Sequence, residues 1–97
     1  MHVLHIEPKQ NLQLIELVKS AIQSEIARLQ LALDLARKRL APFESKYKIS
    51  SEEFIRTQTA EDLQGGDDEY VQWAGEFKLT QRLEEKLNQL KDLRFEY

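Results

Sequence analysis

The acidic stretch EDLQGGDDEYVQWAGEF, residues 61–77, contains the residue types that could do chemistry in this chain. It places a Gly-Gly pair among five acidic residues, followed by a tyrosine and the only tryptophan in the sequence. Carboxylates gathered in this way could hold a divalent cation, begin a helix, or face a basic protein. The spacing of the acids decides among these three roles.

The spacing does not fit a cation loop. A calcium loop of the EF-hand type needs oxygen ligands at alternate positions and a glutamate at the twelfth. Here Asp67, Asp68 and Glu69 are consecutive. We therefore expect no metal site and no cofactor, and we expect Asp67 or Asp68 to cap a helix with Glu69 in its first turn. Beyond capping, the stretch could form a surface for a basic partner, made of Glu61, Asp62, Asp67, Asp68, Glu69 and Trp73.

Trp73 has two possible roles, core packing and an interface hot spot, and its place on a helix allows both. No other group of residues suggests catalysis. His2 and His5 lie three apart without a supporting ligand, and the serines have helical or capping roles. Since no nucleophile is placed beside a base, we predict no catalytic residue and a protein that is not an enzyme.

The basic run at residues 37–39 spreads over about 200° of a helix, so its three side chains do not form one patch. No DNA-binding motif accompanies it, and we do not expect nucleic acid as a ligand. Residues 1–50 carry eight basic and five acidic residues, net +3, whereas residues 51–97 carry six and twelve, net −6. Binding of nucleic acid by the acidic half is therefore disfavoured.

Ninety-seven residues are enough for a single domain, 1–97, with a small core. The sequence contains no cysteine, so disulfides and thiolate metal sites are excluded. Its longest apolar runs are too short to span a membrane, and its first residues lack the pattern of a signal peptide. A cytoplasmic protein is the default expectation.

The first half predicts one long helix. Residues 1–7 form an N-terminal arm that could be a strand, and Pro8 suits a first helical turn. From residue 11 to 41 there is no glycine or proline, and apolar residues recur with helical, near-heptad spacing. That stripe comprises Ile15, Val18, Ile22, Ile26, Leu29, Leu33, Ala36 and Leu40. It is widened by Leu14, Leu17, Ala21, Leu31 and Leu35, a face too broad for one partner helix. We expect a helix over 9–47, kinked near Pro42.

The second half predicts a short helix, a turn and another long helix. Ser50 with Glu53 forms a capping box, and Ile49 with Phe54 a hydrophobic staple, so a helix should cover 51–59. The breaker Gly65-Gly66 lies in an acidic turn over 60–68. The last helix should cover 69–95, with Gly75 allowing another backbone to approach. Six of the eight aromatic residues fall between 43 and 77, and we expect them to form a local core where the long helices are joined.

The fold class that follows is all-α. We predict an elongated antiparallel hairpin of two long helices, joined by a kink, a short helix and a Gly-Gly turn. The hairpin should be coiled-coil-like and oligomeric, because two helices cannot bury both broad stripes within one chain.

The segment FESKYKISSEEFIRTQTAEDLQGGDDEYVQWAGEFKLTQRLEEKLNQL, residues 43–90, resembles a family of small archaeal and bacterial helical proteins that is common in cyanobacteria. Its members share F-E-x-K-Y, S-x-E-E-F and G-D-D-x-x-x-x-W elements. The matching positions are Phe43, Glu44, Lys46, Tyr47, Ser51, Glu52, Glu53, Phe54, Gly66, Asp67, Asp68 and Trp73. Many members have glycine after the tyrosine, where this chain has Lys48, so the turn there could differ.

The resemblance implies a function. Members of the family are usually predicted to be antitoxins, encoded beside a small toxin that is often taken to be a ribonuclease. It therefore implies a non-catalytic protein that binds and neutralises a small basic toxin. The alternative is a structural helical module that acts only by self-association into a dimer or tetramer. Autoregulation by DNA binding is a third class, disfavoured by the missing motif.

Overall fold

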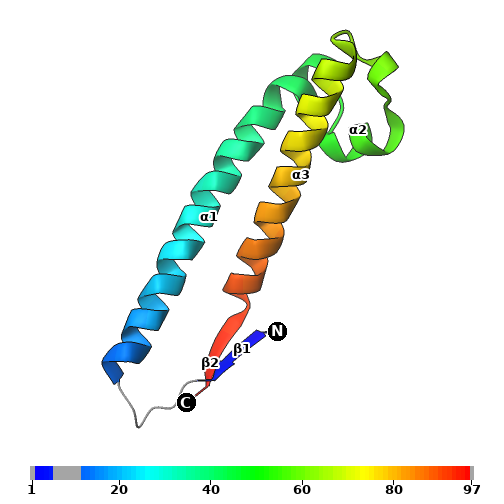
Figure 1. The fold of residues 1–97 in the computed structure, drawn as a ribbon. Coiled ribbons are helices and arrows are strands. Elements are labelled where there is room, and N and C mark those ends of the chain that lie inside the picture. The colour runs from blue at the N-terminus through cyan, green and yellow to red at the C-terminus, as the bar shows by residue number, and fades with distance from the viewer. Residues whose placement is uncertain (1, 6–11, 97) are drawn as a thin grey trace.

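The chain is a long helical hairpin in the computed structural model, which describes residues 2–5 and 12–96 (Figure 1). Its elements are strand β1 (His2–His5), helix α1 (Leu12–Tyr47), helix α2 (Ser51–Thr57), a 3-10 turn (Ala60–Asp62), helix α3 (Gly66–Lys91) and strand β2 (Leu93–Glu96). Helices α1 and α3 run antiparallel, and the molecule measures 62 × 20 × 18 Å. The predicted elongated hairpin of two long helices is confirmed. Within the described residues, no helix combines the length and apolar character needed to cross a bilayer.

Helix α1 follows from its apolar stripe. Its five buried residues, Ile15, Leu29, Leu33, Ala36 and Leu40, all belong to that stripe. The helix continues through Pro42 to Tyr47, at the boundary that the sequence predicts. The predicted start at residue 9 lies outside the described residues.

Two clusters of apolar side chains hold the long helices together. The stem cluster lies at mid-length and comprises Leu29, Leu33 and Leu87, with Ile26, Leu83 and Leu90 packed against it. The tip cluster lies where the chain turns and is built around Leu40, Phe54, Leu63 and Trp73. Six half-buried residues, four of them aromatic, pack against the tip cluster, namely Phe43, Tyr47, Ile49, Tyr70, Ala74 and Phe77. The predicted aromatic core at the joint of the long helices is confirmed.

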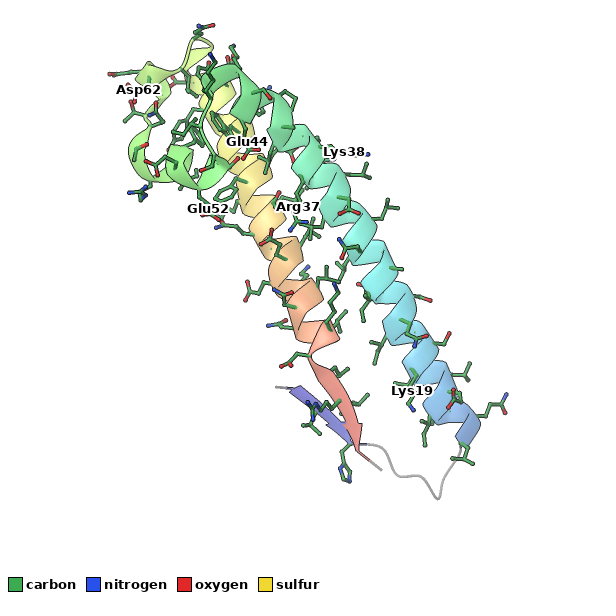
Figure 2. The ribbon with its side chains drawn as sticks, turned by 180° about the vertical axis from the view of Figure 1, so that it is seen from behind. Lys19, Arg37, Lys38, Glu44, Glu52 and Asp62 are labelled. Carbon is green, nitrogen blue, oxygen red and sulfur yellow. The ribbon has the colours of Figure 1, made fainter. Side chains whose placement is uncertain are left out.

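Ion pairs between α1 and α3 use the charge difference between the two halves of the chain. Arg37 pairs with Glu84 at 2.9 Å, and Arg39 pairs with Glu76 at 2.9 Å. Figure 2 shows Arg37 between the long helices, whereas Lys38 points away from α3. Each such exposed pair contributes about 0–1 kcal/mol, so the pairs fix the alignment of the helices more than their stability.

The last helix ends earlier than the sequence predicts. Periodicity extends α3 to residue 95, but it ends at Lys91, and residues 93–96 instead form β2. Strand β2 pairs in parallel with β1, with His2 opposite Leu93 and His5 opposite Glu96. The N-terminal arm therefore contains a strand, and its backbone groups supply the hydrogen-bond partners that draw residues 93–96 out of the helix. Tertiary pairing outweighs local helix propensity here.

Helix α2 and the start of α3 also differ from the predicted bounds. Helix α2 ends at Thr57 instead of 59. Helix α3 begins at Gly66, three residues before the predicted start, with Gly65 at its N-cap and no capping side chain. The prediction that Asp67 or Asp68 caps the helix is therefore wrong. Gly66 is the first residue of α3 and has φ +61°, a left-handed conformation that glycine adopts without strain. Asp67 and Asp68 therefore lie in the first turn of the helix and not at its cap.

Candidate interaction surface at the tip

The tip, where α1 ends and α3 begins, brings together most of the residues that the sequence singles out. Trp73 is completely buried there. Its indole stacks on the ring of Phe54 at 3.8 Å between centroids, and the rings of Phe43 and Tyr47 lie at 5.5 and 5.7 Å. Burial on all sides leaves no surface for a partner to touch, so direct contact of Trp73 with a partner is excluded in this fold. Trp73 is a core residue.

A short hydrogen-bond chain fixes Trp73 to both neighbouring helices. The Trp73 Nε1–H donates to Ser51 Oγ at 2.8 Å, and the Ser51 hydroxyl donates to Glu44 Oε2 at 2.9 Å. The Ser51 backbone N–H donates to the same carboxylate oxygen at 2.9 Å. Residues from α1, α2 and α3 are thus joined through one buried serine. Among the described residues, no buried side-chain nitrogen or oxygen lacks a hydrogen-bond partner.

Glu69 makes a second link between α1 and α3. It accepts hydrogen bonds from the Tyr47 hydroxyl at 2.6 Å and from Lys46 Nζ at 3.0 Å. These two donors, the hydroxyl first, hold the pKa of the Glu69 carboxyl below its usual range. The Tyr47 oxygen also accepts the backbone N–H of Gln64 at 2.9 Å, which ties down the turn before α3. Glu69 is therefore committed to the fold and contributes little to a docking surface.

Gly65 leaves room for this arrangement. A Cβ atom at Gly65 would lie 2.1 Å from Glu69 Oε2 and 2.9 Å from Glu69 Cβ, so any side chain would displace the carboxylate from Tyr47. Gly66 has open space but a positive φ. The two glycines therefore have different physical roles, a close approach at Gly65 and a left-handed backbone at Gly66.

Of the predicted capping box of α2, the structure shows the Ser50 half, whereas the Glu53 carboxylate is engaged elsewhere. Ser50 is the N-cap, and its Oγ accepts the backbone N–H of Glu53 at 3.2 Å. The Glu53 carboxylate pairs with Arg56 one turn later in α2. Ile49 and Phe54 both belong to the tip cluster.

The remaining acidic residues divide into two groups. Asp62 accepts the backbone N–H of Thr59 at 2.8 Å and its hydroxyl at 3.1 Å, so it closes the 3-10 turn. Glu61, Asp67 and Asp68 are exposed, and within the described residues no basic side chain pairs with them. Of the six residues predicted to bind a partner, these three are the ones that the fold leaves available.

Exposed apolar residues also occur on the tip elements. Ile55 on α2 is 42% exposed and Val71 on α3 is 67% exposed. A mainly apolar groove of about 270 Å³ lies between α2 and α3, lined by Ile55, Ala74, Phe77, Lys78 and Gln81. The groove could not be predicted from the sequence, because Ile55 is a single apolar residue of a short helix. It lines a groove only once α2 packs beside α3.

A pocket of about 310 Å³ with a mixed polar and apolar lining opens among the three helices. Its lining includes Arg37, Glu44 and Glu52. Arg37 is already paired with Glu84, and Glu44 with Ser51. Within the part of the chain that the structure describes, no three His, Asp or Glu side chains form a group that could hold a metal ion.

The F-E-x-K-Y element makes structural contacts at the tip. Glu44, Lys46 and Tyr47 of the F-E-x-K-Y element contact Ser51 and Glu69, which lie beyond it in the sequence. These residues build the turn itself, and they specify a scaffold more than a binding preference. Comparisons of the chain with family models, with curated proteins and with solved structures found no match.

Proposed function

We propose that this chain is a non-catalytic protein-interaction module, an antitoxin-like cytoplasmic protein that binds and neutralises a small basic toxin. The observation that carries the proposal is the composition of the tip surface. Exposed carboxylates of Glu61, Asp67 and Asp68 lack a basic partner in the described chain. Val71 is exposed on α3, the helix that carries the two aspartates, and Ile55 is exposed on the neighbouring α2. Carboxylates attract a basic protein, and apolar side chains bury area once it has docked.

The architecture under this surface supports such a role. The stacked aromatic core and the bonds of Ser51 and Glu69 hold the turn in one shape. A surface fixed in advance loses little conformational entropy when a partner binds, and affinity rises accordingly. Neutralisation then needs no chemical step, since covering the toxin's own basic surface suffices to keep its substrate away.

Co-expression with the product of the neighbouring gene tests the proposal. We expect that product to arrest growth alone and this chain to restore growth through a direct complex. If the product is harmless, or if this chain changes neither its toxicity nor its elution on gel filtration, the proposal is wrong.

Matched charge variants locate the binding surface. Asp67→Asn with Asp68→Asn should weaken the complex by at least about tenfold, because two carboxylates facing a basic surface are lost. The control, Glu16→Gln with Glu85→Gln, removes the same charge from exposed positions on α1 and α3 away from the tip. Equal weakening by both pairs would indicate a net-charge effect and would contradict docking at the tip.

A structural module that acts only through self-association is the second candidate. Exposed leucines along α1 favour it, among them Leu17 at 60% and Leu31 at 62% exposure. A stable oligomer that never takes up a second protein in the co-expression experiment would select this alternative over the toxin-binding proposal.

A further inference from the structure

Helix α1 carries a second apolar line that α3 does not cover. The line comprises Leu17, Ala21, Ser24, Arg28, Leu31 and Leu35, which we call the α1 seam, and all six are exposed. Its leucines are 60%, 62% and 46% exposed. The buried residues Leu29, Leu33 and Ala36 lie roughly 100–160° away around the same helix. Leu29 and Leu33 pack against Leu87 of α3.

The spacing of the α1 seam is that of a coiled coil. Successive members are four, three, four, three and four residues apart, so they keep one face toward a partner helix over about 27 Å. Three exposed leucines fall on this one line, with Leu17 and Leu35 at its two ends. The geometry therefore fits one long straight helix as the occupant.

We propose that the occupant is the α1 seam of a second copy, packed antiparallel. In this arrangement, residues whose numbers sum to 52 share a layer. Leu17 then meets Leu35 of the second copy, Ala21 meets Leu31, and Ser24 meets Arg28. Small residues lie opposite large ones at four of the six layers, which suits knobs-into-holes packing.

Charge selects this arrangement over its competitors. A parallel pair would set Arg28 against Arg28 of the second copy, with two like charges in a desolvated seam. The other antiparallel register, shifted by one heptad, would set Arg28 against Leu17. In the proposed register the two-fold axis passes at the level of residue 26, where the Glu25 and Arg28 side chains of both copies meet.

Glu25 already holds Arg28 within one chain, through two hydrogen bonds of 2.6 Å. Near the two-fold axis, Arg28 of one copy lies close to Glu25 of the second copy, because the two residues occupy adjacent layers. It can therefore pair with that glutamate as well as with Glu25 of its own chain. The four charges then alternate in sign around the axis. A parallel dimer cannot produce this arrangement, because it places each residue beside the same residue of the second copy. The inference does not depend on the toxin-binding proposal, since it uses a different surface.

Oligomeric state is the first test. Sedimentation of the full chain at micromolar concentrations should show a dimer. Leu31→Glu with Leu35→Glu should weaken dimerisation by at least about tenfold, because it places four carboxylates in the seam. The matched control, Val71→Glu with Leu79→Glu, adds the same charge at exposed apolar positions of α3, and we expect it to remain dimeric. Circular dichroism checks that all variants keep their helices.

Disulfide trapping tests the orientation, and the absence of native cysteine makes it clean. A mixture of Leu17→Cys and Leu35→Cys chains should form a mixed disulfide dimer under mild oxidation. Each variant alone should not, because its two cysteines would lie about 27 Å apart, far beyond the reach of a disulfide. Efficient linkage of Leu17→Cys with itself would overturn the antiparallel arrangement. A monomeric chain, including one that only binds another protein, or an unchanged dimer in the seam variant would overturn the proposal itself.

Discussion

Ser51 shows how much of the tip depends on a single small side chain. Its hydroxyl accepts from Trp73 and donates to Glu44, while its N–H donates to the same carboxylate. The sequence predicts Ser51 only as a residue in the first turn of a helix, and its partners lie 7 and 22 residues away. Such contacts cannot be read from local periodicity, because they form only once three helices meet.

Lys48 adopts a backbone conformation that costs free energy for any residue with a Cβ atom. Its φ of +54° is left-handed, and the Ile49 N–H donates to the Glu44 carbonyl at 3.3 Å, as in a helix end of the Schellman type. Glycine would relieve the strain. We expect Lys48→Gly to raise the free energy of unfolding by about 1 kcal/mol, measured by urea denaturation followed through Trp73 fluorescence.

Lys48→Ala is the control for this variant. Alanine removes the same charge but keeps a Cβ atom in the left-handed region, so its stability should stay close to that of the wild type. A gain as large as that of glycine would mean that the charge, and not the backbone, limits stability at this turn.

Glu69 should make stability depend on acid pH. Its folded-state pKa lies below the ordinary value of about 4.5, so the carboxylate stabilises the fold above that value. This contribution is lost as the pH falls through the lower folded-state pKa. We expect Glu69→Gln to be less stable than the wild type at pH 7 and the difference to shrink in acid, measured by urea midpoints across that range.

Glu61→Gln serves as the comparison, because Glu61 lies on the same tip without a basic partner in the described chain. It should shift the midpoint little at either pH. A gap between wild type and Glu69→Gln that stays constant down to strong acid would contradict the role assigned to the Glu69 carboxylate.

At the level of elements, α3 contains a glycine with no structural role. The sequence predicts that Gly75 lets another backbone approach, but it is exposed, and nothing lies within 4 Å of a Cβ atom placed there. That prediction is wrong, because both packing clusters use other faces of α3. We expect Gly75→Ala to raise the free energy of unfolding by about 0.5–1 kcal/mol, measured by thermal denaturation.

Gly66→Ala is the opposite case within the same helix. Its φ of +61° strains any residue with a side chain, so the same substitution should destabilise the protein. If Gly75→Ala and Gly66→Ala both raised or both lowered the free energy of unfolding, the distinction between the open helical position of Gly75 and the left-handed position of Gly66 would be wrong.

The elements with strong local signals could be predicted from the sequence. The apolar stripe locates α1 and its buried face, Ser50 marks the start of α2, and Gly65-Gly66 marks the bend. Each of these signals lies within a few residues of the structure that it specifies. The roles of the acidic residues at the tip could not be predicted from the sequence. Only the folded structure shows that Asp62 and Glu69 accept hydrogen bonds within the chain, whereas Asp67 and Asp68 do not.

Strands β1 and β2 could not be predicted from local sequence signals of this kind. Leu93 continues the helical spacing of α3, so periodicity assigns it to a helix. Only the arrival of residues 2–5, brought beside it by the whole hairpin, turns the segment into β2. Strand pairing between distant segments leaves no local pattern to read.

At the scale of the whole molecule, the two proposed surfaces have different chemistry and should respond differently to salt. Binding of a basic partner at the tip relies on exposed carboxylates, and ions screen such charges within about 10 Å at 0.1 M salt. The α1 seam is mainly apolar. We expect raising sodium chloride to weaken the partner complex severalfold while leaving the dimer nearly unchanged, measured by sedimentation of each.

This comparison separates the proposals within one preparation. A partner complex that resists salt would show that its affinity comes from apolar contact, in conflict with docking on the acidic tip. A dimer that dissociates at high salt would mean that the Glu25 and Arg28 charges contribute more to its stability than the leucines of the α1 seam.

The parallel pairing of β1 with β2 has a consequence for how the chain folds. The paired residues His2 and Leu93 are 91 positions apart, so closing the sheet encloses nearly the whole polypeptide in a loop. Contacts of that sequence separation carry the largest loop-closure entropy and form late. The helical hairpin closes through residues 48–65 only, a much smaller loop. We expect the two strands to meet only after the hairpin has formed, so that their pairing marks completed folding.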